Sequence, residues 1–103
     1  MRTPQDVERG LAAPETLGLT SRVEIREAAK HLLAELPTGT GRLVIDLSAT
    51  RTIDSAGLGA LMLIQRMAAE RRQTVALHAP SEEIRFLLVL TKLADLFDID
   101  DGP

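Results

Sequence analysis

Short apolar runs along this chain alternate with longer stretches in which apolar residues recur at helical spacing. Residues 43–48 and residues 74–78 are such short runs, and both predict buried strands. Residues 15–19 alternate apolar and polar positions and could add one edge strand, while residues 98–99 could form a last short strand. Residues 1–13 show no clear period, so we expect them to be loosely ordered.

Three helices are predicted between these strands. The first has an apolar stripe over residues 23–36, and Ser21 is spaced from Glu24 as in a capping box. The second covers residues 58–67, and the third follows a Pro-Ser start and has a predicted buried face over residues 84–93 that includes Leu90. Because connections of helical length suit parallel strand pairs, this alternation predicts an α/β fold.

Residues 54–59, Asp-Ser-Ala-Gly-Leu-Gly, lie between a predicted strand and the second predicted helix. Ser55 therefore falls at or beside the first turn of that helix. The backbone amides of a first turn lack partners within the helix, and the helix dipole there favours negative charge. A phosphate group on Ser55 would be well placed electrostatically, which makes reversible modification plausible at this residue.

A simpler interpretation of the same residues stays open. Asp or Ser before a helix is an ordinary N-cap, and Gly57 could serve only to let the helix pack closely on the sheet.

The second helix also has an unusual composition, because residues 57–65 contain no charged side chain. A helix that covers one side of a sheet needs a single apolar stripe, yet Gly59, Met62, Leu63 and Arg66 fall partly outside that stripe. Either a neighbouring helix buries these positions, or they form a docking surface.

Composition is that of one globular domain: 103 residues, 45% apolar and 26% charged. A net charge of −3 and the absence of Trp and Tyr argue against nucleic acid as the main partner. No apolar run reaches the length of a membrane span, so we expect no direct membrane insertion. The first residues lack the apolar core of a secretory signal, and the expected location is therefore cytoplasmic.

Enzymatic chemistry has little support in the sequence. There is no cysteine, and His31 and His78 are far apart, with no acidic cluster at metal-ligand spacing. Gly57 and Gly59 do not make a phosphate-binding loop, because no Lys follows at the required spacing. We therefore expect no catalytic residue, no metal and no cofactor.

The chain resembles STAS domains of the anti-sigma-factor-antagonist type. The resemblance covers residues 14–99 and rests on the strand residues 44–48, the block at residues 53–59, the basic helix end at residues 66–72 and the segments 81–85, 90–93 and 96–99. It implies one STAS domain over residues 1–103 with a core at 14–99. The implied fold is a small mixed β-sheet with helices mainly on one face and, in this chain, a shortened N-terminal hairpin.

The resemblance also implies a function. The serine after the Asp, here Ser55, is the phosphorylation site of such antagonists, and the modifying kinase is an anti-sigma factor with a GHKL-type serine kinase domain. The unmodified antagonist binds that partner and releases the sigma factor, whereas the phosphorylated form does not bind. The expected partner-binding residues are Asp54, Ser55, Ala56, Gly57, Leu58, Gly59, Met62, Leu63 and Arg66. Thr52 is a second candidate phosphoacceptor, although a solvent-facing loop threonine is the simpler interpretation.

Two other roles stay open. Small stand-alone STAS proteins also serve, without phosphorylation, as accessory subunits of membrane (lipid) ABC transport assemblies, and STAS modules occur in larger sensory complexes. Gly18 stands where an acidic turn residue is usual, and the front of the domain is short. The sheet could therefore have an exposed edge, which would be covered by residues 3–11 or would support self-association.

Overall fold

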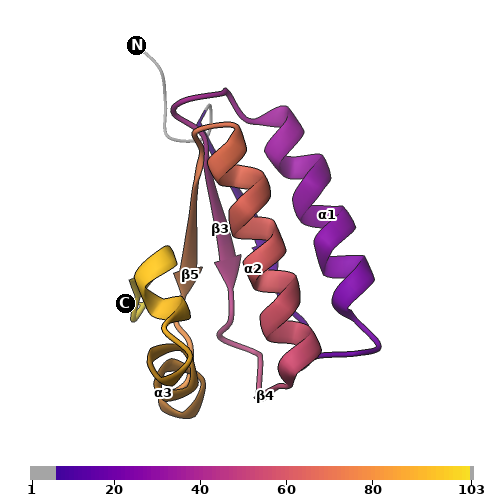
Figure 1. Cartoon of the computed structure of the whole chain (residues 1–103), viewed down its shortest axis with the longest axis vertical. Helices are drawn as coiled ribbons and strands as arrows, with labels where there is room; N and C mark the ends of the chain where they lie inside the picture. Colours follow the sequence, from indigo (N-terminus) through magenta and orange to yellow (C-terminus); the bar gives the residue numbers. More distant parts are fainter. Residues whose placement is uncertain (1–6, 103) are drawn as a thin grey trace.

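The computed structural model describes residues 7–102 of the chain (Figure 1). The strands are β1 (Glu8–Ala12), β2 (Thr16–Leu17), β3 (Arg42–Asp46), β4 (Thr52–Ile53), β5 (Thr74–His78) and β6 (Asp98–Asp100). The helices are α1 (Arg22–Glu35), α2 (Ser55–Glu70), α3 (Glu82–Leu90) and the short 3-10 helix η2 (Leu93–Leu96). Among these residues no helix is both long and apolar enough to cross a bilayer.

The main sheet has four strands in the order β1-β3-β5-β6, and every neighbouring pair is parallel. The expectation of a mixed sheet is therefore wrong for the described residues. The reason lies in the connections: each passes through a helix, which is how parallel neighbours are joined. β2 and β4 form a separate two-residue parallel pair, so the predicted edge strand at residues 15–19 is short and lies outside the main sheet.

The front of the chain differs most from expectation. Glu8–Ala12 form β1, which pairs along its whole length with β3, so the expectation of loose order is wrong for these five residues. Residues 1–6 lie outside the described part of the chain. The described N-terminal residues form no antiparallel hairpin. Of the two alternatives for an exposed sheet edge, cover by residues 3–11 is confirmed for residues 8–11, which lie in β1 beside β3. Pairing with β3, rather than an apolar pattern, makes this segment a strand.

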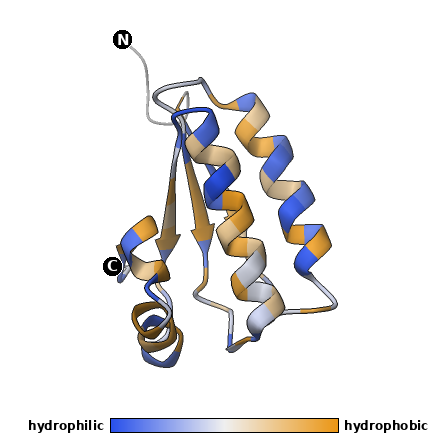
Figure 2. Cartoon of the chain, in the orientation of Figure 1, coloured by the Kyte–Doolittle hydropathy of each residue, from blue (hydrophilic) through white to orange (hydrophobic). Residues whose placement is uncertain are grey.

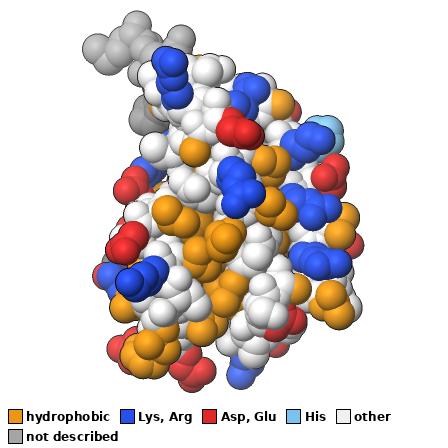
Figure 3. Space-filling view, in the orientation of Figure 1, with side chains coloured by type: hydrophobic (Ala, Val, Ile, Leu, Met, Phe, Trp, Pro, Cys, Tyr) orange, Lys and Arg blue, Asp and Glu red, His pale blue; other side chains and the backbone are white. Residues whose placement is uncertain are grey.

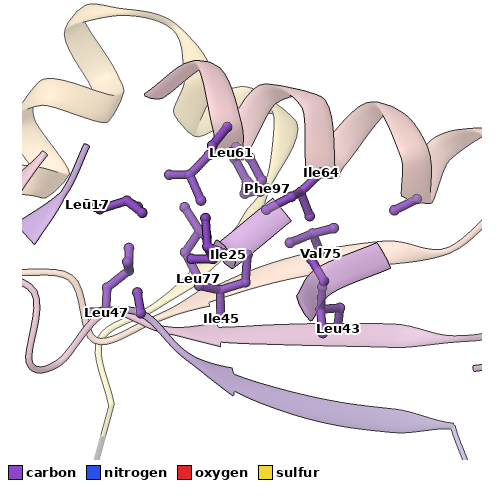
Figure 4. Packing of buried hydrophobic residues seen from close by; sticks show 14 of the residues in the cluster. Leu17, Ile25, Leu43, Ile45, Leu47, Leu61, Ile64, Val75, Leu77 and Phe97 are labelled. Carbon is purple, nitrogen blue, oxygen red and sulfur yellow. The ribbon is translucent and has the colours of Figure 1, made fainter. Parts of the chain in front are cut away.

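Helices α1 and α2 lie over one face of the main sheet (Figure 1). In β3 the side chains of Leu43 and Ile45 are fully buried, whereas Val44, on the opposite face, is only half-buried. The buried side chains of β3 and β5 meet those of α2, including Leu61 and Ile64, in one core (Figure 4). The alternation in β3 therefore sets which face carries the helices.

The predicted apolar stripe is confirmed at Leu33 and Leu36, which are buried, but not at its first residue. Ile25, Ala29 and Leu33 are buried, whereas Val23 is 50% exposed. Ser21 is the N-cap residue, but its side chain does not cap the helix, so the predicted capping box is wrong. The Ser21 hydroxyl donates to the Thr16 carbonyl instead, and it accepts from the Gly18 backbone N–H.

The C-terminal third follows the predicted order of elements. Ser81 caps α3, accepting from the Ile84 backbone N–H at 3.2 Å. The short helix η2 follows, and β6 is the predicted last strand. The predicted burial of Leu90 is wrong, because this side chain is 64% exposed. A helix of nine residues buries only the stripe that contains Ile84 and Leu88, and Leu90 lies off it.

Candidate functional site

The start of α2 is fixed by Asp54, which follows β4 directly. One carboxylate oxygen of Asp54 accepts from the Gly57 backbone N–H at 2.9 Å, and the other accepts from the Leu19 N–H at 3.2 Å. The bond from Gly57 is the largest influence that lowers the pKa of Asp54, and those from Leu19 and Ala56 add to it. Asp54 is therefore the cap of α2 and stays ionised.

Two glycines allow the chain to pass close to this cap. A Cβ atom on Gly57 would overlap the backbone carbonyl oxygen of Leu17, so only glycine lets α2 lie this close to β2. A Cβ atom on Gly18 would overlap the carboxylate of Asp54. The interpretation of Gly57 as a close-packing residue is thus confirmed, and Gly18 gives room to the capping carboxylate.

Ser55 occupies the first position of α2 and is exposed. Its hydroxyl makes no hydrogen bond with any other residue in the described part of the chain. Because Asp54 supplies the cap, the Ser55 oxygen is not needed to hold the helix start. The hydroxyl is available to a reagent or a partner that approaches from solvent.

The face of α2 that continues from Ser55 is only partly covered. Met62 is 41% exposed and Leu63 is 39% exposed, so no neighbouring helix within the described residues buries them. Figure 3 shows apolar side chains gathered over the middle of this side of the molecule, and Figure 2 shows that strongly hydrophilic residues of α2 occur only in the half away from β4. The surface combines a free hydroxyl with exposed apolar side chains.

The nine expected partner-binding residues do not all lie on this surface. Arg66 is exposed, as are Asp54 and Ser55, whereas Ala56 and Gly59 are half-buried at its border. Gly57 is buried, and Leu58 packs partly against the core. We call the set Ser55, Gly59, Met62, Leu63 and Arg66 the α2 face; its members are exposed except for the half-buried Gly59.

A groove runs between the start of α2 and the start of α1. Ser55, Gly59 and Leu63 line it from α2, and Arg22 and Arg26 line it from α1. The positive charge of Arg22 also contributes to the lowered pKa of Asp54. Our reading of the sequence missed both arginines as site residues, although their spacing of four places them on one face of α1.

Thr52, the second candidate phosphoacceptor, differs from Ser55 because its hydroxyl has a hydrogen-bond partner. It is exposed in β4, but its hydroxyl donates to the Thr16 hydroxyl oxygen at 3.4 Å across the β2–β4 pair.

The two histidines lie on different elements, α1 and β5. His31 is exposed on α1, and the Nδ1 atom of His78 lies 2.6 Å from a carboxylate oxygen of Asp100 at the adjoining strand ends. The hydrogen bond from His78 is the main cause that lowers the pKa of Asp100. Within residues 7–102, no three His, Asp or Glu side chains are grouped so that they could hold a metal ion.

The fold agrees with comparisons to known proteins. The family model described as "Mlab, STAS domain" matches residues 9–98. Since this is most of the chain, the protein belongs to that family of STAS domains.

Solved structures show the same fold. One is the crystal structure of TM1081 from Thermotoga maritima, described as a "putative anti-sigma factor antagonist", with 24% identity and a TM-score of 0.77 over 91% of this chain and 79% of that chain. The NMR structure of TM1081 gives 23% identity and a TM-score of 0.78 over 94% and 76%. The predicted α/β STAS-like fold is confirmed, with a parallel sheet and three α-helices.

Proposed function

We propose that this protein is a regulatory binding protein of the anti-sigma-factor-antagonist type, switched by phosphorylation of Ser55. In the unmodified form its α2 face binds an anti-sigma factor that carries a GHKL-type serine kinase domain, and the sigma factor is released. The protein acts by binding in the cytoplasm and requires no cofactor. The observation that carries the proposal is the exposed, unbonded Ser55 hydroxyl beside the exposed Met62 and Leu63.

The proposed modification is an ordinary phosphoryl transfer. A bond forms between the Ser55 oxygen and the γ-phosphorus of ATP, the β–γ bridging bond breaks, and ADP and the hydroxyl proton leave. The modified side chain carries a charge of about −1.5 to −2 at neutral pH. Docking would have to bury this group next to the Asp54 carboxylate. A penalty of about 3 kcal/mol would weaken binding roughly 100-fold.

The experiment is an intact-mass measurement. Wild type and the Ser55→Ala variant are incubated with the candidate serine kinase of the same organism and ATP. We expect wild type to gain the mass of one phosphate group and the variant to gain none. Thr52→Ala is the matched control, and it should be modified like wild type. Equal uptake by wild type and Ser55→Ala, or uptake by neither, would contradict the proposal.

A second candidate function is an accessory subunit of a membrane ABC transport assembly. The matching family model is described as Mlab, not as an antagonist, and the exposed apolar side chains of α2 would serve such a subunit without any use of the hydroxyl. This role predicts that the protein co-purifies with a membrane ATPase and that Ser55→Ala and Ser55→Asp bind it equally.

A further inference from the structure

The groove between α1 and α2 places two cations opposite the proposed phosphorylation site. Arg22 and Arg26 contribute to its lining together with Ser55, although the two arginines are about 30 residues away in sequence. They lie one helical turn apart on α1, so their guanidinium groups can act on the same ligand. Figure 3 shows basic side chains aligned on the part of the surface that α1 forms.

Both arginines are uncommitted in the unmodified protein. Arg9, Arg42 and Arg85 each have an ion pair with a carboxylate. The side chains of Arg22 and Arg26 make no ion pair and no hydrogen bond within residues 7–102, although Arg22 acts on Asp54 through its charge. The Asp54 oxygens already accept backbone N–H groups of Gly57 and Leu19. The guanidinium groups are therefore free to take a stronger anion.

We propose that Arg22 and Arg26 bind the phosphate of phosphorylated Ser55 within the same molecule. The inference rests on the proposed function for its biological relevance. Arginine is suited to the task, because its planar fork of N–H donors matches two phosphate oxygens at once. The two cations also offset the repulsion that Asp54 exerts on a phosphate at the adjacent residue.

This pairing changes how the switch works. The phosphate lies in the groove and neutralises the two charges that border the α2 face, instead of projecting freely into solvent. A partner that approaches the modified protein meets a filled groove that has lost its positive charge. The loss of binding then depends on Arg22 and Arg26 as well as on Ser55.

The test uses protein in which phosphoserine is incorporated genetically at position 55, so no kinase is required. The readout is the second pKa of the phosphate, followed by ³¹P NMR during a pH titration. For unconstrained phosphoserine this pKa is near 6. We expect it to be lower by about 0.5–1 unit in the folded wild type than in the urea-unfolded chain, because the arginines favour the dianion.

The double variant Arg22→Gln and Arg26→Gln should lose most of that shift, whereas the double variant with Lys at both positions should keep part of it. Lys30→Gln is the matched control, since Lys30 lies one further turn along α1 and outside the lining of this groove. A shift that is the same in wild type and the double Gln variant would overturn the proposal. So would the absence of any shift on folding.

The outcome is separate from that of the kinase experiment. If the kinase leaves Ser55 unmodified but the arginines shift the phosphate pKa, then the proposed function fails and the phosphate site stands as a property of the fold. If the kinase modifies Ser55 and no shift is seen, the switch stands and the phosphate is held by solvent alone.

Discussion

Helices α2 and α3 both begin after a polar residue that caps them, but the serines at the two starts do different things. At α3 the serine is the cap: the Ser81 hydroxyl accepts from the Ile84 backbone N–H. At α2 an aspartate has taken the capping role, and Ser55, one residue later, has a hydroxyl without a partner in the described chain. A serine near a helix start thus has a structural role when it is itself the cap. When its neighbour is the cap, its hydroxyl remains free for modification or for binding a partner.

The starts of α2 and α3 also differ in the charged residues that surround them. Glu82 and Glu83 lie in the first turn of α3, where carboxylates complement the helix dipole. The first turn of α2 contains no acidic residue, and Arg22 and Arg26 border it. Negative charge is already supplied at α3, whereas at α2 a place for further negative charge remains beside Ser55.

The largest expected effect concerns the close approach that holds the start of α2. Gly57→Ala places a methyl group on the Leu17 carbonyl oxygen and should destabilise the protein by about 3 kcal/mol. Gly59→Ala is the matched control in the same helix, because a Cβ atom there meets nothing within 4 Å. This control should stabilise by about 0.5–1 kcal/mol through helix propensity. Urea denaturation of both variants gives the comparison, and equal losses would contradict the packing assigned to Gly57.

The next largest effect is the loss of stability on removing a helix cap, compared with the loss on removing the unbonded Ser55 hydroxyl. Asp54→Ala and Ser81→Ala should each cost about 1 kcal/mol, because each removes the acceptor for a first-turn N–H group. Ser55→Ala should change the free energy of unfolding by less than about 0.5 kcal/mol, since its hydroxyl is unbonded. The same denaturation series measures all three. A loss for Ser55→Ala as large as that for Ser81→Ala would erase the distinction between the two starts.

The smallest effect is the pH dependence that Asp54 contributes. Its pKa is lowered in the folded state from an ordinary value of 3.8, so its stabilising contribution is present above that value. The contribution is lost as the pH falls through the lower, folded pKa. Asp54→Asn keeps a capping oxygen without the charge, and we expect it to lose less stability than wild type between about pH 5 and pH 2. Parallel stability–pH curves would contradict the assignment.

Local pattern predicted the central and C-terminal elements well. Residues 74–78 form β5 as expected, because a fully buried strand is a continuous apolar run that periodicity detects. The strand at Glu8–Ala12 was missed because its sequence, Glu-Arg-Gly-Leu-Ala, contains no β-branched residue and only one large apolar side chain. Its conformation comes from pairing with β3, which lies about 30 residues further on.

For the candidate site too, the sequence predicted the local structure but not the contacts between distant segments. The order Asp54 then Ser55 before an uncharged helix indicated the right helix start, but it left open which residue was the cap. Asp54 is the cap because its carboxylate accepts from the Gly57 N–H, and its other oxygen accepts from the Leu19 N–H, 35 residues away in the sequence. The arginines of α1 were missed for a similar reason: their helix was predicted, but which helix it lies beside depends on the tertiary fold.

The most direct measurement is the affinity of the protein for its serine kinase partner by isothermal titration calorimetry, with and without phosphoserine at position 55. We expect the unmodified protein to bind and the phosphorylated protein to bind at least about 100-fold more weakly, a difference of about 3 kcal/mol. Equal affinities of the two forms for the same kinase would contradict the claim that the Ser55 hydroxyl controls docking on the α2 face.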